Sequence, residues 1–273
     1  MNRKALPLVV LICVSMLACS LVNSITSAAG NSSQGTQAVN PSTQSSPSSP
    51  TQSSSQSSSS GPCSNLYYPV KKGATWTYMI SGLPTGASTY VDTVTDVRSD
   101  GFTDTAVFDN KLTRASQWSC AADGLLELSL GNAAAITATN TQAQFTVTNS
   151  SGVTLPSNIA AGQSWSYKLD IQGTMSLQNN AVKTQGTTSY QMTALGNESV
   201  TVPGGTFNAM KLQISGTFDI QVSVQGNAMP FSIPITATAW YAPNVGMVKQ
   251  AESANMMGNT VNATTELQSY NIP

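Results

Sequence analysis

Apolar and polar residues alternate strictly over long stretches of this 273-residue chain. Every second residue from Phe218 to Val224 is apolar, and the residues between them are Asp, Gln and Ser. The same alternation runs from Trp165 to Ile171, and Trp76, Tyr78 and Ile80 share one side of a shorter run whose other side has threonines and Met79. A period of two is typical of a strand with one buried face. Because residues 62–273 contain no sustained 3.6-residue period, the sequence predicts an antiparallel, all-β domain.

Turn residues divide this region into short runs. Ser99-Asp100-Gly101 stands between two β-branched runs, which favours a hairpin, and Pro203-Gly204 suits a type II turn. Gly, Thr, Ser and Asn recur roughly every ten residues, as in all-β domains. The pattern is compatible with one curved sheet or half-barrel and equally with a sandwich of two sheets.

All four tryptophans fall into two matched pairs, which predict an internally duplicated β meander. Gly73-Ala-Thr-Trp76-Thr-Tyr78 matches Gly162-Gln-Ser-Trp165-Ser-Tyr167. Trp118 and Trp240 are each followed by five residues and then a glycine, Gly124 or Gly246. We therefore expect two related halves, at about 66–150 and 155–270, with the paired tryptophans in shared core roles. Sugar stacking is the alternative use of these rings.

These same motifs carry a family resemblance. Residues 67–78, Val202-Pro-Gly-Gly-Thr-Phe207 and Trp240-Tyr-Ala-Pro-Asn-Val-Gly246 resemble a set of bacterial envelope proteins that includes the TapB-like lipoproteins associated with type IV pili. The resemblance covers most of residues 66–270. Because its motifs are structural, it implies an envelope location and a β fold more than an activity.

The N-terminus is typical of a lipoprotein signal peptide. Arg3 and Lys4 precede an apolar run from Leu6 to Leu17, which is short for a membrane span. The run ends Met16-Leu17-Ala18-Cys19, which resembles the bacterial lipobox, and this resemblance implies cleavage after residue 18 and lipidation of Cys19. Ordinary secretion, with cleavage near residues 28–29, is the alternative.

A low-complexity segment separates this anchor from the domain. Residues 42–60 contain only Ser, Thr, Gln and Pro. Such a composition cannot offset the entropy of ordering, so residues 19–61 are predicted to be a disordered tether. The sequence thus predicts an exported protein, held through its lipid on the outer face of a bacterial membrane, with its folded domain at 62–273.

Cys63 and Cys120 are the only cysteines beyond Cys19. In an exported protein, two remaining cysteines are expected to pair in a disulfide. A metal site is the competing interpretation, but the chain has no histidine, and two cysteines alone make a poor zinc site.

The sequence carries few signs of catalysis. Without histidine, histidine-based triads are excluded, and no nucleophile elbow or phosphate-binding loop is present. Paired carboxylates could still hydrolyse glycosides. The densest acids are expected at solvated hairpin ends, with a calcium site at Asp100 and Asp104 as a weaker alternative; these acids are Asp92, Asp96, Asp100, Asp104 and Asp109.

We therefore expect a non-enzymatic, lipid-anchored envelope protein whose β domain serves protein interaction or envelope and pilus assembly. The alternative is a module that binds a carbohydrate or a hydrophobic ligand. No catalytic, cofactor or metal residues are predicted. The expected partners are the membrane and an envelope protein or glycan. Only 11 basic residues face 12 acidic ones, with no basic cluster, which disfavours nucleic acid.

Overall fold

The computed structural model describes residues 63–130, 143–177, 180–224, 227–256 and 259–273. The predicted signal peptide, the lipidation site Cys19 and the predicted tether lie outside these ranges, so they stay predictions. Within the described ranges the regular secondary structure is all β-strand, as predicted. A search of the same ranges finds no helix long and apolar enough to span a membrane.

The described residues form thirteen strands, which all belong to one sheet. The strands of the first half are β1 (Thr75–Ser81), β2 (Ser88–Val97), β3 (Gly101–Phe108), β4 (Thr113–Ala121) and β5 (Gly124–Glu127). Two strands connect the halves, β6 (Ala143–Gly152) and β7 (Leu155–Pro156). The strands of the second half are β8 (Ser164–Leu177), β9 (Asn180–Val202), β10 (Gly205–Val224), β11 (Asn227–Ala242), β12 (Gly246–Met256) and β13 (Asn259–Asn271).

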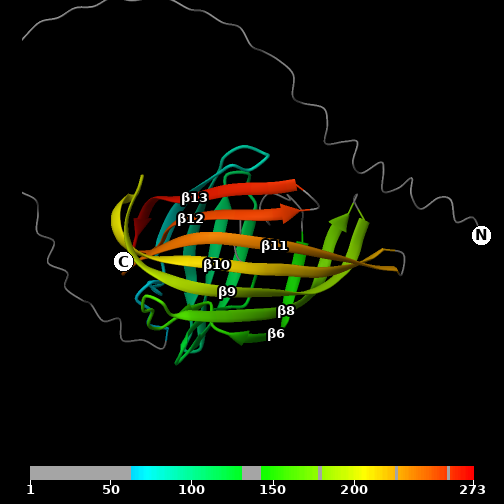
Figure 1. The fold of residues 1–273 in the computed structure, drawn as a ribbon, viewed down its shortest axis with the longest axis horizontal. Coiled ribbons are helices and arrows are strands. Elements are labelled where there is room, and N and C mark those ends of the chain that lie inside the picture. Colours follow the sequence, from blue (N-terminus) through cyan, green and yellow to red (C-terminus); the bar gives the residue numbers. More distant parts are fainter. Residues whose placement is uncertain (1–62, 131–142, 178–179, 225–226, 257–258) are drawn as a thin grey trace, which may run out of the picture. The chain divides into compact units, whose positions relative to one another are not determined.

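The sheet order is β6-β8-β9-β10-β11-β12-β13-β1-β2-β3-β4-β5-β7, with every neighbouring pair antiparallel. The last strand, β13, pairs with the first, β1, and so joins two runs of hairpins into one sheet. In Figure 1, β8 to β13 form the front layer and the strands of the first half cross behind them. The sheet is therefore curled into a half-barrel, which decides between the two predicted architectures.

Residues 152–156 link the two ends of the curled sheet. Gly152 pairs with Tyr167 of β8, whereas Leu155 pairs with Leu125 of β5. This approach requires a glycine at position 124, which has φ +150°, because a Cβ there would stand 2.4 Å from the carbonyl oxygen of Leu155. The half-barrel thus encloses an interior between its two runs of strands.

A short N-terminal segment is fastened to the same end of the domain. Cys63 and Cys120 form a disulfide, which confirms the predicted pairing. The Asn65 side chain donates hydrogen bonds to the carbonyl oxygens of Leu155 and Pro156, at 3.2 and 3.0 Å. Tyr68 follows on this segment and is thereby directed into the interior.

The local structure at Trp76 recurs at Trp165. Gly73 and Gly162 lie in turns with φ values of +86° and +83°. The amide of Gly73 donates to the Val94 carbonyl, and that of Gly162 donates in the same way to the Ala194 carbonyl. Each tryptophan is then the second residue of its strand, β1 or β8. The predicted duplication is not settled by such local matches and stays a prediction.

Trp118 and Trp240 occupy different faces of the sheet despite their equal spacing to a glycine. The β4–β5 hairpin closes with Ala121 opposite Gly124, while β11–β12 closes with Ala242 opposite Gly246 and carries a bulge after Trp240. A shift of one residue moves a side chain to the other face. Trp118 is consequently buried, whereas Trp240 is half-buried on the outer face.

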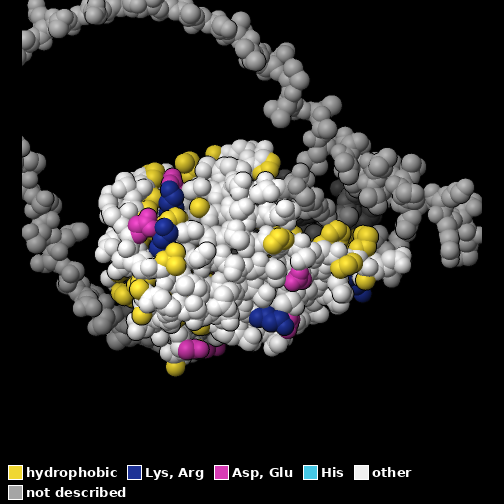
Figure 2. Space-filling view, in the orientation of Figure 1, with side chains coloured by type: hydrophobic (Ala, Val, Ile, Leu, Met, Phe, Trp, Pro, Cys, Tyr) yellow, Lys and Arg dark blue, Asp and Glu magenta, His cyan; other side chains and the backbone are white. Residues whose placement is uncertain are grey.

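The ring of Trp240 lies among ion pairs on that outer face. Lys211 Nζ stands 5.5 Å from the centre of the ring and also pairs with Glu198 at 2.8 Å. Lys249, opposite Trp240 on β12, pairs with Glu266 at 2.8 Å. Figure 2 shows basic and acidic side chains gathered beside hydrophobic ones on this face. Three of the tryptophans thus belong to the core, and Trp240 only packs against it from the outer face.

Candidate functional site

A cavity of about 200 Å³ lies inside the half-barrel, and we call it the inner cavity. Residues from both runs of strands and from the N-terminal segment line it. Its lining includes eight aromatic rings, namely Tyr68, Trp76, Tyr78, Tyr90, Trp118, Tyr167, Tyr190 and Tyr241. It also includes four carboxylates, those of Asp92, Asp104, Glu127 and Glu252. An interior that combines rings with acids in this way is not an ordinary apolar core.

Strand alternation places two of these acids inside. Asp92 lies between the buried residues Tyr90 and Val94 of β2 at two-residue spacing, and Asp104 lies between Phe102 and Ala106 of β3. The expectation that both would sit at solvated hairpin ends is therefore wrong. The reason is their phase: each occupies the inward-facing position of its strand.

The other three aspartates of this region are on the outside, as expected. The Asp96 carboxylate is half-exposed and pairs with Arg98 at 3.0 Å. Asp100 and Asp109 are exposed beside their turns. Because Asp104 points inward and Asp100 outward, the pair suggested for calcium is not brought together. Among the described residues there is no group of three or more Cys, Asp or Glu side chains that could hold a metal ion.

Asp104 is fixed by two donors from different elements. Its Oδ2 accepts hydrogen bonds from Tyr68 Oη at 2.6 Å and from Trp118 Nε1 at 2.9 Å. Its Oδ1 is buried and has no hydrogen-bond partner. Burial raises the pKa of this carboxyl, and hydrogen bonds from Tyr68, Trp118 and Ser116 partly oppose that rise. Two strong donors thus hold Oδ2, whereas Oδ1 has no partner of good hydrogen-bond geometry.

Asp92 has a similar unpartnered oxygen. Its Oδ1 is buried without a hydrogen-bond partner. Burial raises the pKa of Asp92 well above its ordinary range, and the neighbouring charges of Asp104 and Glu127 raise it further. A buried carboxylate oxygen without a partner costs free energy, so such atoms call for an explanation.

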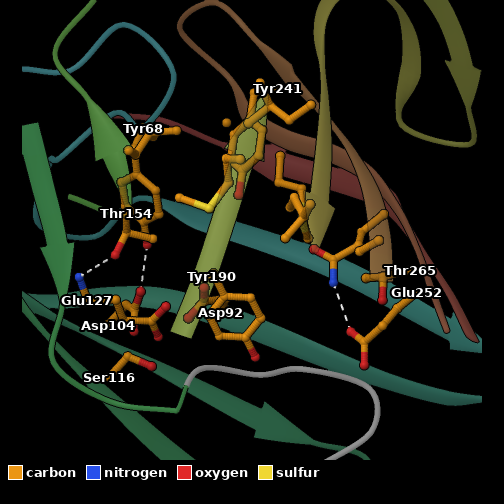
Figure 3. Close-up of a pocket in the computed structure, with 18 of the residues that line it drawn as sticks. Tyr68, Asp92, Asp104, Ser116, Glu127, Thr154, Tyr190, Tyr241, Glu252 and Thr265 are labelled. Atoms are coloured by element: carbon orange, nitrogen blue, oxygen red, sulfur yellow. Dashed lines mark hydrogen bonds between the residues drawn. The ribbon is translucent and has the colours of Figure 1, made fainter. Parts of the chain in front are cut away.

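Glu127 completes the acidic group at the end of β5. Its backbone amide donates to Thr154 Oγ1 at 3.0 Å, and its Oε1 accepts from Ser129 Oγ at 3.0 Å. Burial, and then the charge of Asp104, raise the pKa of Glu127 to about 8. Figure 3 shows Asp104, Glu127 and Thr154 on one side of the cavity and Glu252 on the other.

No Lys or Arg is among the described residues that line the inner cavity. Arg114, on the inner face of β4, lies with its guanidinium carbon 5.4 Å from the centre of the Phe108 ring and is not part of the lining. The carboxylates of the cavity therefore face rings, hydroxyls and one another.

The two runs of strands contribute matched tyrosines to the cavity. Tyr78 lies opposite Tyr90 in the β1–β2 register, with ring centres 5.2 Å apart. Tyr167 lies opposite Tyr190 in the β8–β9 register, with ring centres 5.0 Å apart. Burial raises the pKa of Tyr190 to about 12, so its phenol stays protonated at neutral pH.

The residues beside these tyrosine pairs differ in chemistry. Asp92 stands opposite Trp76 between β1 and β2, and Met192 stands opposite Trp165 between β8 and β9. We call the β1–β5 side of the cavity the first wall and the β8–β12 side the second wall. The first wall therefore presents a carboxylate at the position where the second presents a thioether. Further along the second wall, Glu252 is buried and accepts a hydrogen bond from Gln250 Nε2 at 3.0 Å (Figure 3).

The tryptophans and glycines of the two sequence repeats have different structural roles. Trp76 and Trp118 line the cavity, and Trp165 is buried and donates to the Thr154 carbonyl at 3.2 Å. Gly124 and Gly246 both open a return strand with positive φ. The three acids Asp92, Asp104 and Glu127 were missed.

A signal for one of the missed acids was present in the sequence. Thr89-Tyr90-Val91-Asp92-Thr93-Val94 matches Ser189-Tyr190-Gln191-Met192-Thr193-Ala194 in the position of its tyrosine and second threonine. Because 188–195 reads as a strand, the match assigns Asp92 to the face of Tyr90. No comparable sequence signal marks Glu127, because its position in the cavity depends on contact with the segment 152–156.

Comparisons with other proteins give a family and three fold neighbours. A family model described as DUF3108-like matches residues 87–267. No curated protein matches the chain. A solved structure from Bacteroides fragilis, described as an exported protein with a YmcC-like fold, is 14% identical with TM-score 0.47, over 76% of this chain and 100% of that one.

Two further solved structures are similar at about the same level. A protein from Parabacteroides distasonis, described as a lipoprotein, is 17% identical with TM-score 0.44, over 76% of this chain and 99% of its own. The hypothetical lipoprotein YmcC from Escherichia coli is 12% identical with TM-score 0.34, over 75% of this chain and 87% of its own. None of these descriptions mentions pili, so the TapB-like resemblance stays a prediction.

Proposed function

This chain belongs to the DUF3108-like family, and from that premise we propose that it is a non-enzymatic cell-envelope protein, lipid-anchored at Cys19, whose β domain binds a small polar molecule in the inner cavity. The observation that supports the proposal is the pair of buried, unpartnered carboxylate oxygens, one on Asp92 and one on Asp104, at the wall of a cavity. A protein that only needed a core would fill this space with apolar side chains.

The size and chemistry of the cavity favour a small polar ligand over a lipid or a long glycan. At about 200 Å³ it is below the roughly 300–1,000 Å³ of sites for drug-sized molecules. An acyl chain would leave the carboxylates without partners, which disfavours a lipid. A long glycan needs an open row of rings, whereas the tryptophans Trp76 and Trp118 are buried. The expected role in protein interaction or envelope and pilus assembly stays a prediction, to which no surface of the domain is assigned.

The carboxylates do not have the division of roles that glycoside hydrolysis needs. That reaction requires one carboxyl that stays protonated and a second that stays ionised. Here the pKa values of Asp92, Asp104 and Glu127 are all raised, with burial as the largest cause. The same cause dominates in all three, so no one of them is set apart as the ionised partner, and binding is favoured over catalysis.

A cavity-filling variant tests the proposal. Ala237, which lines the cavity from β11, can be replaced by Phe to occupy the space. Small polar compounds from envelope extracts should raise the melting temperature of the wild-type protein and leave that of Ala237→Phe unchanged. The far-ultraviolet circular dichroism of the two proteins should agree. If no fraction stabilises the wild type more than the variant, ligand binding in the cavity is rejected.

Two further measurements examine the rest of the proposal. The Cys19→Ala protein should be released from membranes, and persistent membrane association would contradict the lipid anchor. Aryl glycosides should not be turned over at a measurable rate. Turnover that disappears in Glu127→Gln would instead assign the domain to the glycoside hydrolases.

A further inference from the structure

We propose that the ligand of the inner cavity is a small organic cation, an alkyl-substituted ammonium, held by Asp92, Asp104 and Glu127 and surrounded by aromatic rings. This inference rests on the proposed function, because it names the chemical class of ligand for the same cavity. It is drawn from three features of the lining: four carboxylates with no Lys or Arg among them, the density of rings, and the absence of a metal-type cluster among the described residues.

The first feature is the charge of the lining. Four carboxylates line the cavity, and no Lys or Arg is among its described lining residues. Buried carboxylates in proteins are paired with a cation or are protonated. The oxygens Asp92 Oδ1 and Asp104 Oδ1 are buried and lack even a hydrogen-bond donor. An ammonium ligand supplies the positive charge, and an N–H or a hydroxyl on it can donate to these oxygens, whereas a neutral sugar would supply donors without charge.

The second feature is the wall of rings. The rings of Tyr68, Trp76 and Trp118 stand close to one another, at 5.5 Å between Tyr68 and Trp76 and 5.2 Å between Tyr68 and Trp118. The tyrosine pairs on β1–β2 and β8–β9 add further rings around the cavity. An ammonium whose positive charge is spread over alkyl groups is attracted to ring faces, and cages of rings and acids suit it.

The third feature concerns the kind of cation. Metal ions require several ligand atoms within about 2.6 Å of one point. The described residues contain no cluster of three or more acids arranged in that way. The acids instead lie on separate strands, β2, β3, β5 and β12. Carboxylates spread around a cavity suit a cation of several heavy atoms, which can meet more than one of them.

Binding of a cation should be linked to pH through Glu127. The titratable groups that share the cavity with it are the acids Asp92, Asp104 and Glu252 and the phenols of Tyr68, Tyr78, Tyr90, Tyr167, Tyr190 and Tyr241. The pKa of Glu127 is raised to about 8, so this carboxyl is largely protonated at pH 7 in the empty protein. A bound cation favours the ionised form and should therefore release protons.

The test uses a pair of probes that differ in charge alone. Choline and 3,3-dimethylbutan-1-ol have the same shape, but choline has a quaternary nitrogen where the alcohol has a carbon. Isothermal titration calorimetry of the full mature protein in a non-ionic detergent should give a choline affinity at least about tenfold above that of the alcohol. Choline affinity should rise between pH 6 and pH 8.5, with proton release detected as a dependence of the heat on the buffer.

Variants connect this result to the cavity. Glu127→Gln and Asp92→Asn should each weaken choline binding by about tenfold or more, and Glu127→Gln should also remove most of the pH dependence. Glu198→Gln is the matched control, since Glu198 is on the outer face in a half-exposed pair with Lys211. Its choline affinity should equal that of the wild type.

Each outcome bears on a distinct statement. If the alcohol binds as tightly as choline and Ala237→Phe blocks both, the cation inference is overturned while ligand binding in the cavity stands. If choline binds equally to Glu127→Gln, to Asp92→Asn and to the wild type, the inference is likewise overturned, because the site is elsewhere. If neither probe binds at concentrations up to about 10 mM, the cation inference fails, and ligand binding is then judged by the melting-temperature experiment alone.

Discussion

The β1–β2 pair and the β8–β9 pair have the same local structure, and only one of their inward-facing differences changes the chemistry from charged to apolar. Both begin with a glycine turn, both place a tryptophan second in the strand, and both carry a cross-strand tyrosine pair. Opposite the tryptophan, one pair has Asp92 and the other has Met192. The shared features build the sheet, and the differing residue decides what the inside can bind.

The comparison also predicts which of the two positions lowers the free energy of unfolding. A thioether packs against a ring without a desolvation cost. A carboxylate in the equivalent position is buried beside two other acids, and its pKa is raised well above normal. A residue that destabilises the fold at the wall of a cavity is typical of a functional site, where stability and activity conflict. The position of Asp92 should therefore respond to pH, whereas that of Met192 has no titratable group.

The largest expected effect is a loss of stability with rising pH. Glu127 has an ordinary pKa of 4.5 and a folded-state pKa of about 8. The folded protein therefore binds more protons than the unfolded chain between these values, so stability falls as pH rises. At about 1.4 kcal/mol per pH unit, this interval corresponds to roughly 5 kcal/mol at most for Glu127. Urea denaturation at pH 5 and pH 9 measures the change.

Two variants show which side of the cavity causes the pH dependence of stability in that experiment. Glu127→Gln should remove a large part of the slope, whereas Tyr190→Phe should retain it, because the Tyr190 phenol with a pKa of about 12 stays protonated up to pH 9. Asp109 and Asp170 have lowered pKa values, so their contributions are lost only in more acidic solution and do not affect this range. A stability that is flat or that rises from pH 5 to pH 9 would contradict the buried acidic wall.

The next effect distinguishes the two tryptophans that the sequence treats as equivalent. Trp118→Ala should cost about 3–5 kcal/mol, because it removes a buried ring stacked on Phe102 at 5.3 Å and takes away one of the donors to Asp104 Oδ2. Trp240→Ala should cost less, about 1–2 kcal/mol, because its half-buried ring contacts Lys211 and only the margin of the core. Chemical denaturation of both variants gives the difference, and equal losses would support matched core roles instead.

The class of fold could be predicted because alternation depends only on neighbouring residues. The strands around Phe218, Ile220 and Val222 were recognisable, and so was the disulfide, since only two cysteines were left to pair. The curled sheet could not be separated from a sandwich, because that depends on β13 pairing with β1 across nearly the whole sequence. Local patterns contain no information on that pairing.

The site was harder to predict than the fold. Asp92 and Asp104 were read as solvated because aspartate is usually exposed, although their spacing to Tyr90 and Phe102 placed them on the inner face. The outward position of Trp240 depends on one additional turn residue and a bulge, which the spacing to Gly246 does not reveal. Average tendencies of residue types misled the interpretation at the positions where function departs from them.

A smaller effect, a gain in stability, should follow when Asp92 is replaced by the residue that occupies the matching position of the second wall. Asp92→Met introduces the residue that Met192 provides opposite Trp165, and it removes an oxygen with no partner. We expect the free energy of unfolding at pH 8 to rise by about 1–3 kcal/mol while choline binding is lost. Met192→Asp is the reverse exchange and should destabilise the protein. A destabilised Asp92→Met protein would contradict the conflict between stability and binding at this position.

The smallest effect tests the matched turns themselves. Gly73 and Gly162 have nearly the same positive φ, and a Cβ would meet no atom closer than 3.8 Å at Gly73 and none within 4 Å at Gly162. Replacement by Ala therefore adds backbone strain without a clash, at about 1 kcal/mol for each site. Gly124→Ala should cost clearly more, because its Cβ would stand 2.4 Å from the Leu155 carbonyl oxygen. Equal, small losses at Gly73 and Gly162 would support two copies of one turn, and a difference above about 1 kcal/mol would show that the resemblance ends at the backbone.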